Sequence, residues 1–381
     1  MIDDPILFKP IRMGGVDLSN RIVVAPMSQY QGFEGKPSNW HRQHLGSLAL
    51  GGASLLMVEA TAVTMDGRLT PGCLCLSTDE QQGALAELVA FIRSVGASCA
   101  IGLQLSHAGR KGSVWRPWEG GGPLSPGEGG WPTVAPSALP FRDGDHPPTE
   151  MSLTDIDELT QAFTSSAERA FAAGVDVVEL HAVHGSLLHQ FLSPLTNHRT
   201  DRYGGDGKAR LIEQIVGRIV AVCPRDRAFG VRLAVSDGVP GGLSVEDATP
   251  VATRLGELGI SYICISTGGN TPPSGFPTAP CYQAALAGVV KRALNIPVRV
   301  AGLIVSPFHA EVLIAGGDAD LVAIGRGFLD DPRWGWHAAD SLGSASARPA
   351  PYLRVSDGQW PGVRFKAGRE DCFAFEAPSA G

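Results

Sequence analysis

The sequence predicts an α/β protein built as a single (β/α)₈ barrel, with a long loop insertion after the third strand and an irregular C-terminal tail. Short apolar runs alternate eight times with stretches of helical periodicity along the chain. The length of 381 residues fits one barrel with insertions. No Gly-x-Gly-x-x-Gly turn follows the first strand, so a Rossmann domain has no support.

The eight predicted strands are apolar on both faces, as parallel strands covered by helices usually are. They are Ile22–Ala25, Leu55–Glu59, Ala100–Leu105, Val177–His181, Phe229–Leu233, Tyr262–Ser266, Val298–Ala301 and Leu321–Ile324. Amphipathic stretches separate them. One of these, Asp155–Ala173, opens with a capping pattern that starts at Ser152 and closes at Gly174.

The segment Gly112–Pro148 interrupts this alternation. Its density of Gly, Pro and Trp prevents a regular helix, and a loop of this length in a compact domain is often a lid or a binding element. A surface insertion without a role is the alternative, and the sequence leaves both open. We expect the barrel to span residues 1–340 and the tail to span residues 341–381.

Composition excludes several classes of protein. A hydrophobic content of 44% allows a large core, and 18% charged residues argue against a disordered or coiled-coil chain. The formal net charge of −7 disfavours nucleic acid and anionic membrane as partners. The chain has no signal-peptide pattern and no apolar run of about 18 residues. Its seven cysteines are scattered, so we expect a reduced, cytoplasmic protein. With nucleic acid and membrane disfavoured, the expected partner is a small-molecule substrate.

Polar residues at the predicted strand ends indicate where chemistry takes place, because the carboxyl ends of barrel strands build the active site. Gly302, Gly325 and Arg326 follow the last two strands, where many barrels bind a phosphate. Gln104 can offer a donor and an acceptor to a planar heterocycle. Arg232 places a permanent positive charge where an anionic ring would need it.

Two histidines, His181 and His184, follow the fourth strand at a spacing that lets them converge on one oxygen atom. A zinc site is the alternative interpretation. No carboxylate or third histidine stands at a matching strand end, so we expect no metal.

Several longer motifs, in register from about residue 5 to residue 340, resemble those of the Old Yellow Enzyme family. The closest likeness is to its bacterial branch, called thermophilic-like or xenobiotic-reductase-like. The segments are Ala25-Pro26-Met27, Val58-Glu59-Ala60-Thr61, Gln104-x-x-His107-Ala108-Gly109-Arg110-Lys111, Glu179-Leu180-His181-x-x-His184-Gly185, Asn197-His198-Arg199-x-Asp201-x-Tyr203-Gly204-Gly205 and Gly325-Arg326.

The resemblance implies non-covalent FMN, NADPH or NADH as electron donor, and reduction of an alkene conjugated to a carbonyl or nitro group. It implies that His181 and His184 bind the activating oxygen of the substrate and that Tyr30 lines the substrate pocket. It also implies a homo-oligomer, dimer or tetramer, in which a C-terminal segment carrying Arg354 reaches a neighbouring subunit's site. The residues implied for FMN are Ala25, Pro26, Met27, Ser28, Ala60, Gln104, Arg232, Gly302, Gly325 and Arg326.

Two positions depart from the family pattern. Ser28 replaces a cysteine that tunes the flavin potential in this branch, and Ser186 replaces a tyrosine that donates a proton to the substrate. A serine hydroxyl is a much weaker acid than a phenol. Ene reduction is then slow unless Tyr30 or water supplies the proton, or else the absent ring leaves room for a bulky, natural-product-like substrate. In the second case the tryptophans of the long loop could wall the pocket, namely Trp115, Trp118 and Trp131.

Two other functions stay open at this stage. A specialised flavoenzyme acting as a desaturase, isomerase or aromatase is consistent with the lost tyrosine. A flavin-binding protein with vestigial catalysis is the other alternative, and the retention of His181, His184 and Arg232 argues against it.

Overall fold

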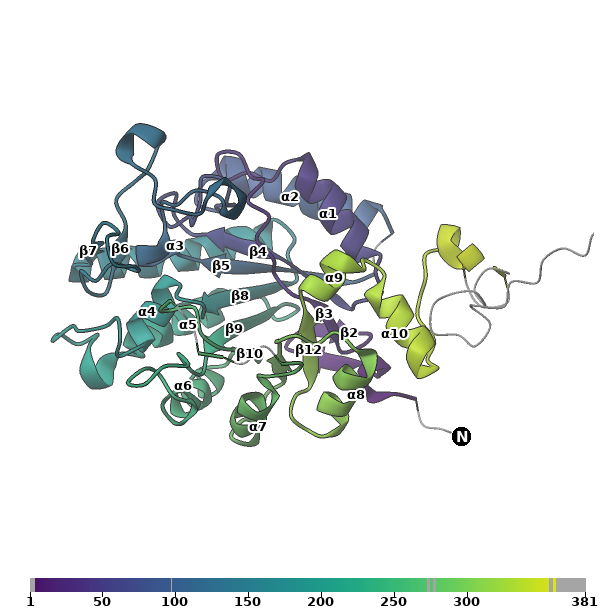
Figure 1. Cartoon of the computed structure of the whole chain (residues 1–381). Coiled ribbons are helices and arrows are strands. Elements are labelled where there is room, and N and C mark those ends of the chain that lie inside the picture. The colour runs from purple at the N-terminus through teal and green to yellow at the C-terminus, as the bar shows by residue number, and fades with distance from the viewer. Residues whose placement is uncertain (1–3, 97, 273–274, 277–278, 356–358, 361–381) are drawn as a thin grey trace, which may run out of the picture.

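In the computed structural model, which describes residues 4–96, 98–272, 275–276, 279–355 and 359–360, eight parallel strands close into a barrel. The predicted fold is confirmed (Figure 1). Pairing of the last strand with the first closes the barrel. In spatial order the strands are β3 (Ile22–Val24), β4 (Leu55–Ala62), β5 (Ala100–Ser106), β8 (Val177–Ala182), β9 (Ala228–Ala234), β10 (Tyr262–Ser266), β11 (Val298–Val300) and β12 (Leu321–Ile324).

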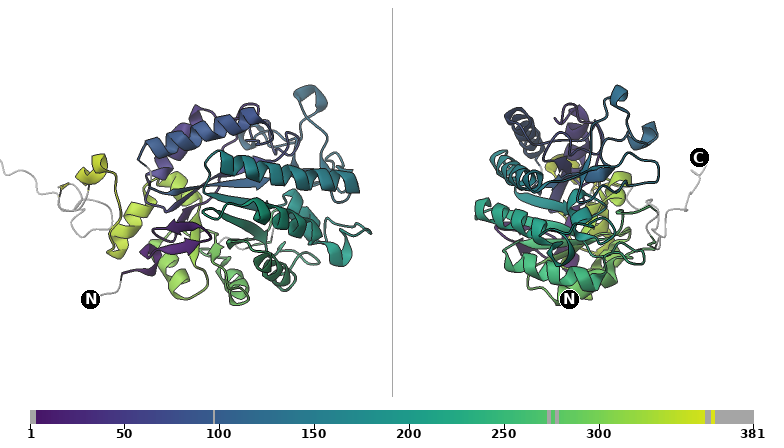
Figure 2. Two further views of the ribbon diagram at one scale, coloured as in Figure 1. Left: turned by 180° about the vertical axis from the view of Figure 1, so that it is seen from behind. Right: turned by 90° about the vertical axis from the view of Figure 1, so that its left-hand side faces the viewer.

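Helices follow the strands and cover the outside of the barrel, as Figures 1 and 2 show. One apolar cluster fills the layer between strands and helices, and a second fills the barrel interior. The helices are α1 (Asn39–Ala49), α2 (Asp79–Ser94), α3 (Leu153–Ala172), α4 (Leu187–Leu192), α5 (Arg210–Val222), α6 (Val245–Glu257), α7 (Ala284–Arg292), α8 (Pro307–Ala315), α9 (Arg326–Asp330) and α10 (Trp334–Leu342).

An antiparallel hairpin plugs the amino-terminal end of the barrel. Its strands are β1 (Ile11–Met13) and β2 (Val16–Leu18), and their buried side chains join the interior cluster. The hairpin and α10 lie at one end of the molecule, whereas α4 and the β6–β7 region lie at the other end (Figures 1 and 2). The plug closes one end, so a ligand can enter the barrel only at the carboxyl ends of the strands.

Most predicted strand bounds agree with the structure to within one residue, but β4 runs three residues beyond the predicted end at Glu59. A shift of register between Val58 and Ala60 explains the difference. Glu59 is the extra residue of this bulge, and the pairing with β5 resumes beyond it. A charged residue within an apolar run suggests that the strand ends at Glu59. The bulge instead lets the strand continue past this residue.

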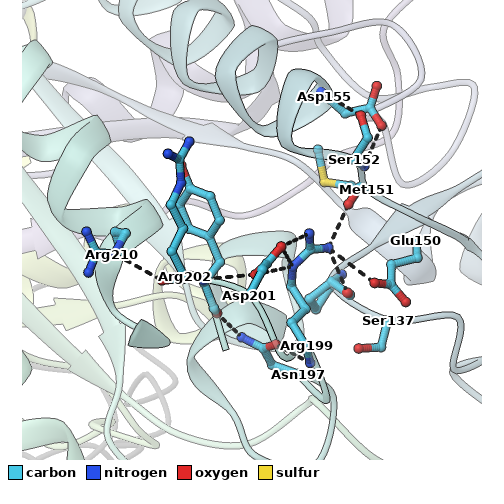
Figure 3. Close-up of polar contacts among 12 residues, drawn as sticks. Ser137, Glu150, Met151, Ser152, Asp155, Asn197, Arg199, Asp201, Arg202 and Arg210 are labelled. Carbon is cyan, nitrogen blue, oxygen red and sulfur yellow. Dashed lines mark hydrogen bonds and ion pairs between the residues drawn. The ribbon is translucent and has the colours of Figure 1, made fainter. Parts of the chain in front are cut away.

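The predicted capping pattern begins helix α3 at Leu153, two residues before the predicted start. The Asp155 N–H donates to Ser152 Oγ at 3.2 Å, and the Ser152 N–H donates to Asp155 Oδ2 at 2.7 Å (Figure 3). This reciprocal pair satisfies two N–H groups that have no partner within the helix. The helix ends at Ala172, just before the predicted glycine.

The segment 112–148 is a folded loop held against the barrel. It contains the 3₁₀ turns η3 (Pro117–Glu119) and η4 (Pro126–Glu128) and the short strand β6 (Val134–Ala135), which pairs with β7 (Thr149–Glu150). Buried Arg199 anchors it by donating to the carbonyl oxygens of Pro136 at 3.1 Å and Met151 at 2.6 Å (Figure 3).

The rest of the Asn197–Gly205 motif supports this anchor. Asp201 accepts from Arg199 Nη2 at 2.5 Å, and the Asn197 amide donates to the Phe191 and Tyr203 carbonyls at 2.7 Å each (Figure 3). These contacts give the motif a structural role in fixing the loop, because Asn197 and Arg199 bind backbone carbonyls and Asp201 binds Arg199.

After α10 the described part of the tail forms a 3₁₀ segment, η6 (Ala350–Val355). The Tyr352 ring packs against Trp336 with 5.4 Å between centroids, and Arg333 lies over both rings. The end of the predicted tail, residues 361–381, lies outside the described residues. The six cysteines within the described ranges are free, and no helix there is long and apolar enough to cross a bilayer.

Candidate active site

A cavity of about 530 Å³ opens at the carboxyl ends of the barrel strands. Four cations reach it, Arg68, Lys111, Arg232 and Arg326, and none of its described lining residues is acidic. Such a cavity favours an anionic ligand. Of the residues predicted for the site, these line it: Ala25, Pro26, Met27, Ser28, Tyr30, Ala60, Gln104, His181, His184, Ser186, Arg232, Gly302, Gly325 and Arg326.

The remaining predicted residue, Arg354, is exposed on η6 and is not among the residues that line the cavity of its own chain. The expected wall of tryptophans is wrong, because Trp115, Trp118 and Trp131 do not line the cavity either. Two of them instead support residues that do. The Trp118 ring lies 6.0 Å from that of Tyr30, and the Arg68 guanidinium lies 5.0 Å from the centre of the Trp131 ring.

Gln104 is oriented by a buried network beneath the cavity floor. Its Nε2 donates to Glu179 Oε1 at 2.9 Å, while the other carboxylate oxygen accepts from the Tyr262 hydroxyl at 2.9 Å and pairs with Arg299. The Tyr262 ring reaches the carboxylate because Gly230 has no side chain; a Cβ there would lie 2.3 Å from the ring. Because a carboxylate can only accept, Gln104 must present its amide nitrogen to it. Its oxygen is then left for a ligand.

The segment after β3 is fixed from below by Glu59. The Gln29 N–H donates to Glu59 Oε2, and His41 Nε2 lies 3.4 Å from Oε1 of the same buried carboxylate. This support holds the segment from Pro26 to Tyr30 against the cavity. Burial, then the charge of Cys73, raises the pKa of the Tyr30 hydroxyl to about 12. Tyr30 is therefore a weak acid at neutral pH.

His181 and His184 lie together in the cavity, with 5.3 Å between their ring centroids. His184 Nε2 is 2.9 Å from Ser266 Oγ, which also accepts from Arg232 Nη2 at 3.3 Å. Burial, and then the charge of Arg232, lowers the pKa of both imidazoles well below 6.5. Both rings are neutral at pH 7, and each carries one N–H that can donate to an oxygen. His181 Nδ1 is buried and has no partner among the described residues.

Ser186 also faces the cavity, at the N-cap of α4, but its hydroxyl donates to the His181 carbonyl oxygen at 2.6 Å. That hydrogen bond uses the one proton the side chain has to offer. Position 186, where the sequence predicts the loss of a proton donor, thus holds a small side chain whose only proton is engaged in a backbone hydrogen bond.

Glycines shape the far end of the cavity. Gly302 has φ +120°, and a Cβ there would lie 3.1 Å from Tyr282 and Gln283 side-chain atoms. Gly325 precedes α9, whose first residue, Arg326, is exposed and makes no ion pair with the described residues. Gln283 Oε1 is buried there and has no partner among the described residues, while its Nε2 donates to the Tyr282 hydroxyl at 2.6 Å. Close backbone approach and a free cation together suit a phosphorylated ligand.

His107, another strand-end histidine, does not line the cavity. Its Nδ1 accepts from the Gly109 N–H at 3.0 Å, which stabilises the turn after β5. In the part of the chain that the structure describes, no three His, Cys, Asp or Glu side chains converge on a potential metal site.

Acid is expected to destabilise the protein through His107. Burial lowers its pKa from 6.5 to about 4. The stability that depends on the neutral ring is therefore complete above pH 6.5 and is lost as the pH falls toward 4. Urea titrations should show about 2 kcal/mol of this stability disappearing between pH 7.5 and pH 5, with the remainder lost toward pH 4. His107→Asn keeps an acceptor for Gly109 without titrating, so equal acid sensitivity in variant and wild type would contradict this assignment.

Comparisons with known proteins agree with this geometry. The model of the NADH:flavin oxidoreductase / NADH oxidase family matches residues 6–343. The chain belongs to this family. It is 38% identical over 355 residues to an NADPH dehydrogenase of Geobacillus sp. (strain WCH70), covering 92% of this chain and 98% of that one. An NADH:flavin oxidoreductase of Gibberella zeae is 38% identical over 346 residues, covering 86% and 83%. Among solved structures, morphinone reductase superposes with a TM-score of 0.73 at 27% identity, over 92% of each chain.

Membership confirms the Old Yellow Enzyme resemblance and makes the chain an FMN-dependent NAD(P)H oxidoreductase. The residues present fit FMN. The glycine-walled end with Arg326 suits its phosphate, and the free oxygen of Gln104 together with Arg232 suits its ring.

Several residues that line the site were not assigned a role from the sequence, among them Ser266, Lys111, Tyr282 and Gln283. Ser266 ends a predicted strand, so the rule that selected Arg232 could have found it. Lys111 lay in a quoted motif; its Nζ donates to the His184 carbonyl at 2.8 Å, and burial, then nearby Arg110, lowers its pKa to about 8. Tyr282 and Gln283 lie in an irregular connection after β10, where no motif or periodicity indicates a site.

Proposed function

We propose that this enzyme reduces an electron-poor alkene conjugated to a carbonyl or nitro group. The observation that carries the proposal is the neutral pair His181 and His184, which faces the cavity beside Arg232. Two N–H groups that bind the activating oxygen withdraw electrons from the double bond and make its β-carbon a hydride acceptor. FMN, when bound, supplies that hydride from its N5.

Protonation of the α-carbon is the step for which this cavity is poorly equipped. The Ser186 hydroxyl donates to backbone, and burial raises the pKa of both Tyr30 and Cys73. Lys111 has a pKa of about 8, but its ammonium is committed to the His184 and Gly269 carbonyls. Water or Tyr30 then supplies the proton slowly. Acceptors whose hydride adduct is already a stabilised anion, such as nitroalkenes, depend less on this step than simple enones do. Small side chains at Ala62, Ala108 and Ser186 leave width for a bulky substrate.

We also propose that the enzyme assembles as a homo-oligomer in which Arg354 contributes to a neighbouring subunit's site. Its exposure on η6, away from its own cavity, supports this placement. The residue is still predicted from the family resemblance to bind substrate.

The histidine pair provides the test of the proposed function. His181→Ala and His184→Ala should each weaken binding of a phenolic ligand such as 4-hydroxybenzaldehyde about tenfold, the equivalent of about 1.4 kcal/mol, because each removes a buried donor. Affinity is measured from the long-wavelength charge-transfer band. FMN content should stay near that of the wild type. His107→Asn, outside the cavity, is the matched control. Unchanged affinity in the double variant would refute the role of the pair.

A further inference from the structure

His184 has an uncommon backbone conformation for a residue with a side chain. Its φ is +57°, and Gly185 follows with φ +74°, so two consecutive residues lie in the left-handed region. That conformation is strained for a non-glycine residue and persists only where surrounding contacts impose it. The direction of the His184 ring depends on this backbone, since the ring is attached at the unusual turn.

Side chains of α4 bind the Gly185 peptide groups from below. His189 Nδ1 accepts from the Gly185 N–H at 3.0 Å, and Gln190 Nε2 donates to the Gly185 carbonyl at 2.8 Å. Both side chains are fully buried. Lys111 completes the clamp from the other side by donating to the His184 carbonyl. The turn that presents His184 is thus held at three polar points.

Asp237 determines which nitrogen of His189 can accept. Its Oδ1 lies 3.0 Å from His189 Nε2, and both side chains have 0% exposure. Its Oδ2 accepts from Ser193 Oγ at 2.6 Å and from the Leu243 N–H at 2.7 Å. Since a carboxylate can only accept, Nε2 must carry the proton, and Nδ1 is left unprotonated to accept from Gly185.

We propose that His189 and Asp237 are positioning residues for His184. They act through the Gly185 N–H, and neither is among the residues that line the cavity. The inference rests on the proposed function, because its consequence is measured at the oxygen-binding pair. It assigns a purpose to a buried contact between a neutral imidazole and a carboxylate that the hydride-transfer reaction does not use directly.

Two substitutions of His189 separate its contact with the Gly185 N–H from its contact with Asp237. His189→Asn retains an acceptor near the position of Nδ1, facing Gly185, but cannot reach Asp237. His189→Gln places its amide near the position of Nε2, facing Asp237, but loses the acceptor for Gly185. We expect His189→Gln to weaken binding of 4-hydroxybenzaldehyde at least tenfold in the holoenzyme, and His189→Asn to weaken it less than threefold. FMN dissociation constants, from flavin fluorescence, should change less than twofold in both.

Asp237→Asn gives an independent test should His189→Gln fail to fold. The Ser193 and Leu243 donors select the amide oxygen of Asn, so its nitrogen must face His189 Nε2. That contact moves the imidazole proton to Nδ1, where it opposes the Gly185 N–H. Phenol affinity should again fall at least tenfold, with FMN affinity retained.

The outcomes are distinguishable from failure of the proposed function. If His184→Ala leaves phenol affinity unchanged, the oxygen-binding role itself is wrong. A second outcome is that His184→Ala weakens phenol affinity, whereas His189→Gln and Asp237→Asn only lower the melting temperature. His189 and Asp237 would then serve stability alone, and this inference would be overturned. Equal losses in His189→Asn and His189→Gln would also overturn it, because the acceptor at Gly185 would then have no special effect.

Discussion

Ser186→Tyr is expected to accelerate the reoxidation of reduced enzyme by cyclohexenone at least tenfold. Serine at this position donates to the His181 carbonyl at 2.6 Å, and burial raises the pKa of both Tyr30 and Cys73. The ammonium of Lys111, whose pKa falls to about 8, donates to the His184 and Gly269 carbonyls. A phenol in reach of the substrate α-carbon would supply the missing proton, a contribution typically worth about 10²–10⁴-fold. A tenfold gain is about 1.4 kcal/mol in the barrier. Anaerobic stopped-flow measures it directly.

Ser186→Phe is the matched control for this experiment. It fills nearly the same volume without an acidic proton, so it should not accelerate cyclohexenone reduction. Both aromatic variants should lose affinity for wide ligands, since both occupy the space that serine leaves. Flavin reduction by NADPH needs no proton donor and should change little in either variant. If Tyr and Phe give the same enone rate, proton supply does not limit the reaction and the serine serves only for width.

The barrel and most of its site were predictable because two physical rules apply along the whole chain. Parallel strands covered on both faces read as apolar runs, which located Tyr262–Ser266 and Leu321–Ile324 at their observed bounds. The carboxyl ends of such strands meet at one mouth, which brought Gln104, His181 and Arg232 together.

The contacts that orient those residues were not predictable in the same way. Glu179 begins the motif that contains His181 and His184, but its partner Arg299 is 120 positions away, and no local pattern pairs the two residues. The loop tryptophans were misplaced because composition shows that a loop is aromatic but not which way its rings point. His189 lies in a short helix whose sequence is otherwise mostly apolar, so nothing local indicated that its contact with the Gly185 N–H fixes the turn after His184.

The Glu179 and Arg299 pair is expected to give the largest loss of stability. Both side chains are fully buried, and removing one charge from such a pair typically costs about 3–5 kcal/mol because the other is left uncompensated. Glu179→Gln should therefore lower the free energy of unfolding, measured in urea, by that amount. Adding Arg299→Met removes the buried charge that Glu179→Gln leaves unpaired. The double variant should therefore recover at least half of the lost free energy of unfolding.

FMN affinity should not recover with stability in the double variant. The carboxylate of Glu179 obliges Gln104 to turn its amide nitrogen inward and its oxygen toward the cavity. A glutamine at position 179 can both donate and accept, so Gln104 is free to present either end to the flavin. We expect the FMN dissociation constant, from fluorescence titration, to stay about tenfold above that of the wild type, the equivalent of about 1.4 kcal/mol. If it returns to the wild-type value together with the free energy of unfolding, Glu179 acts on FMN only by stabilising the barrel.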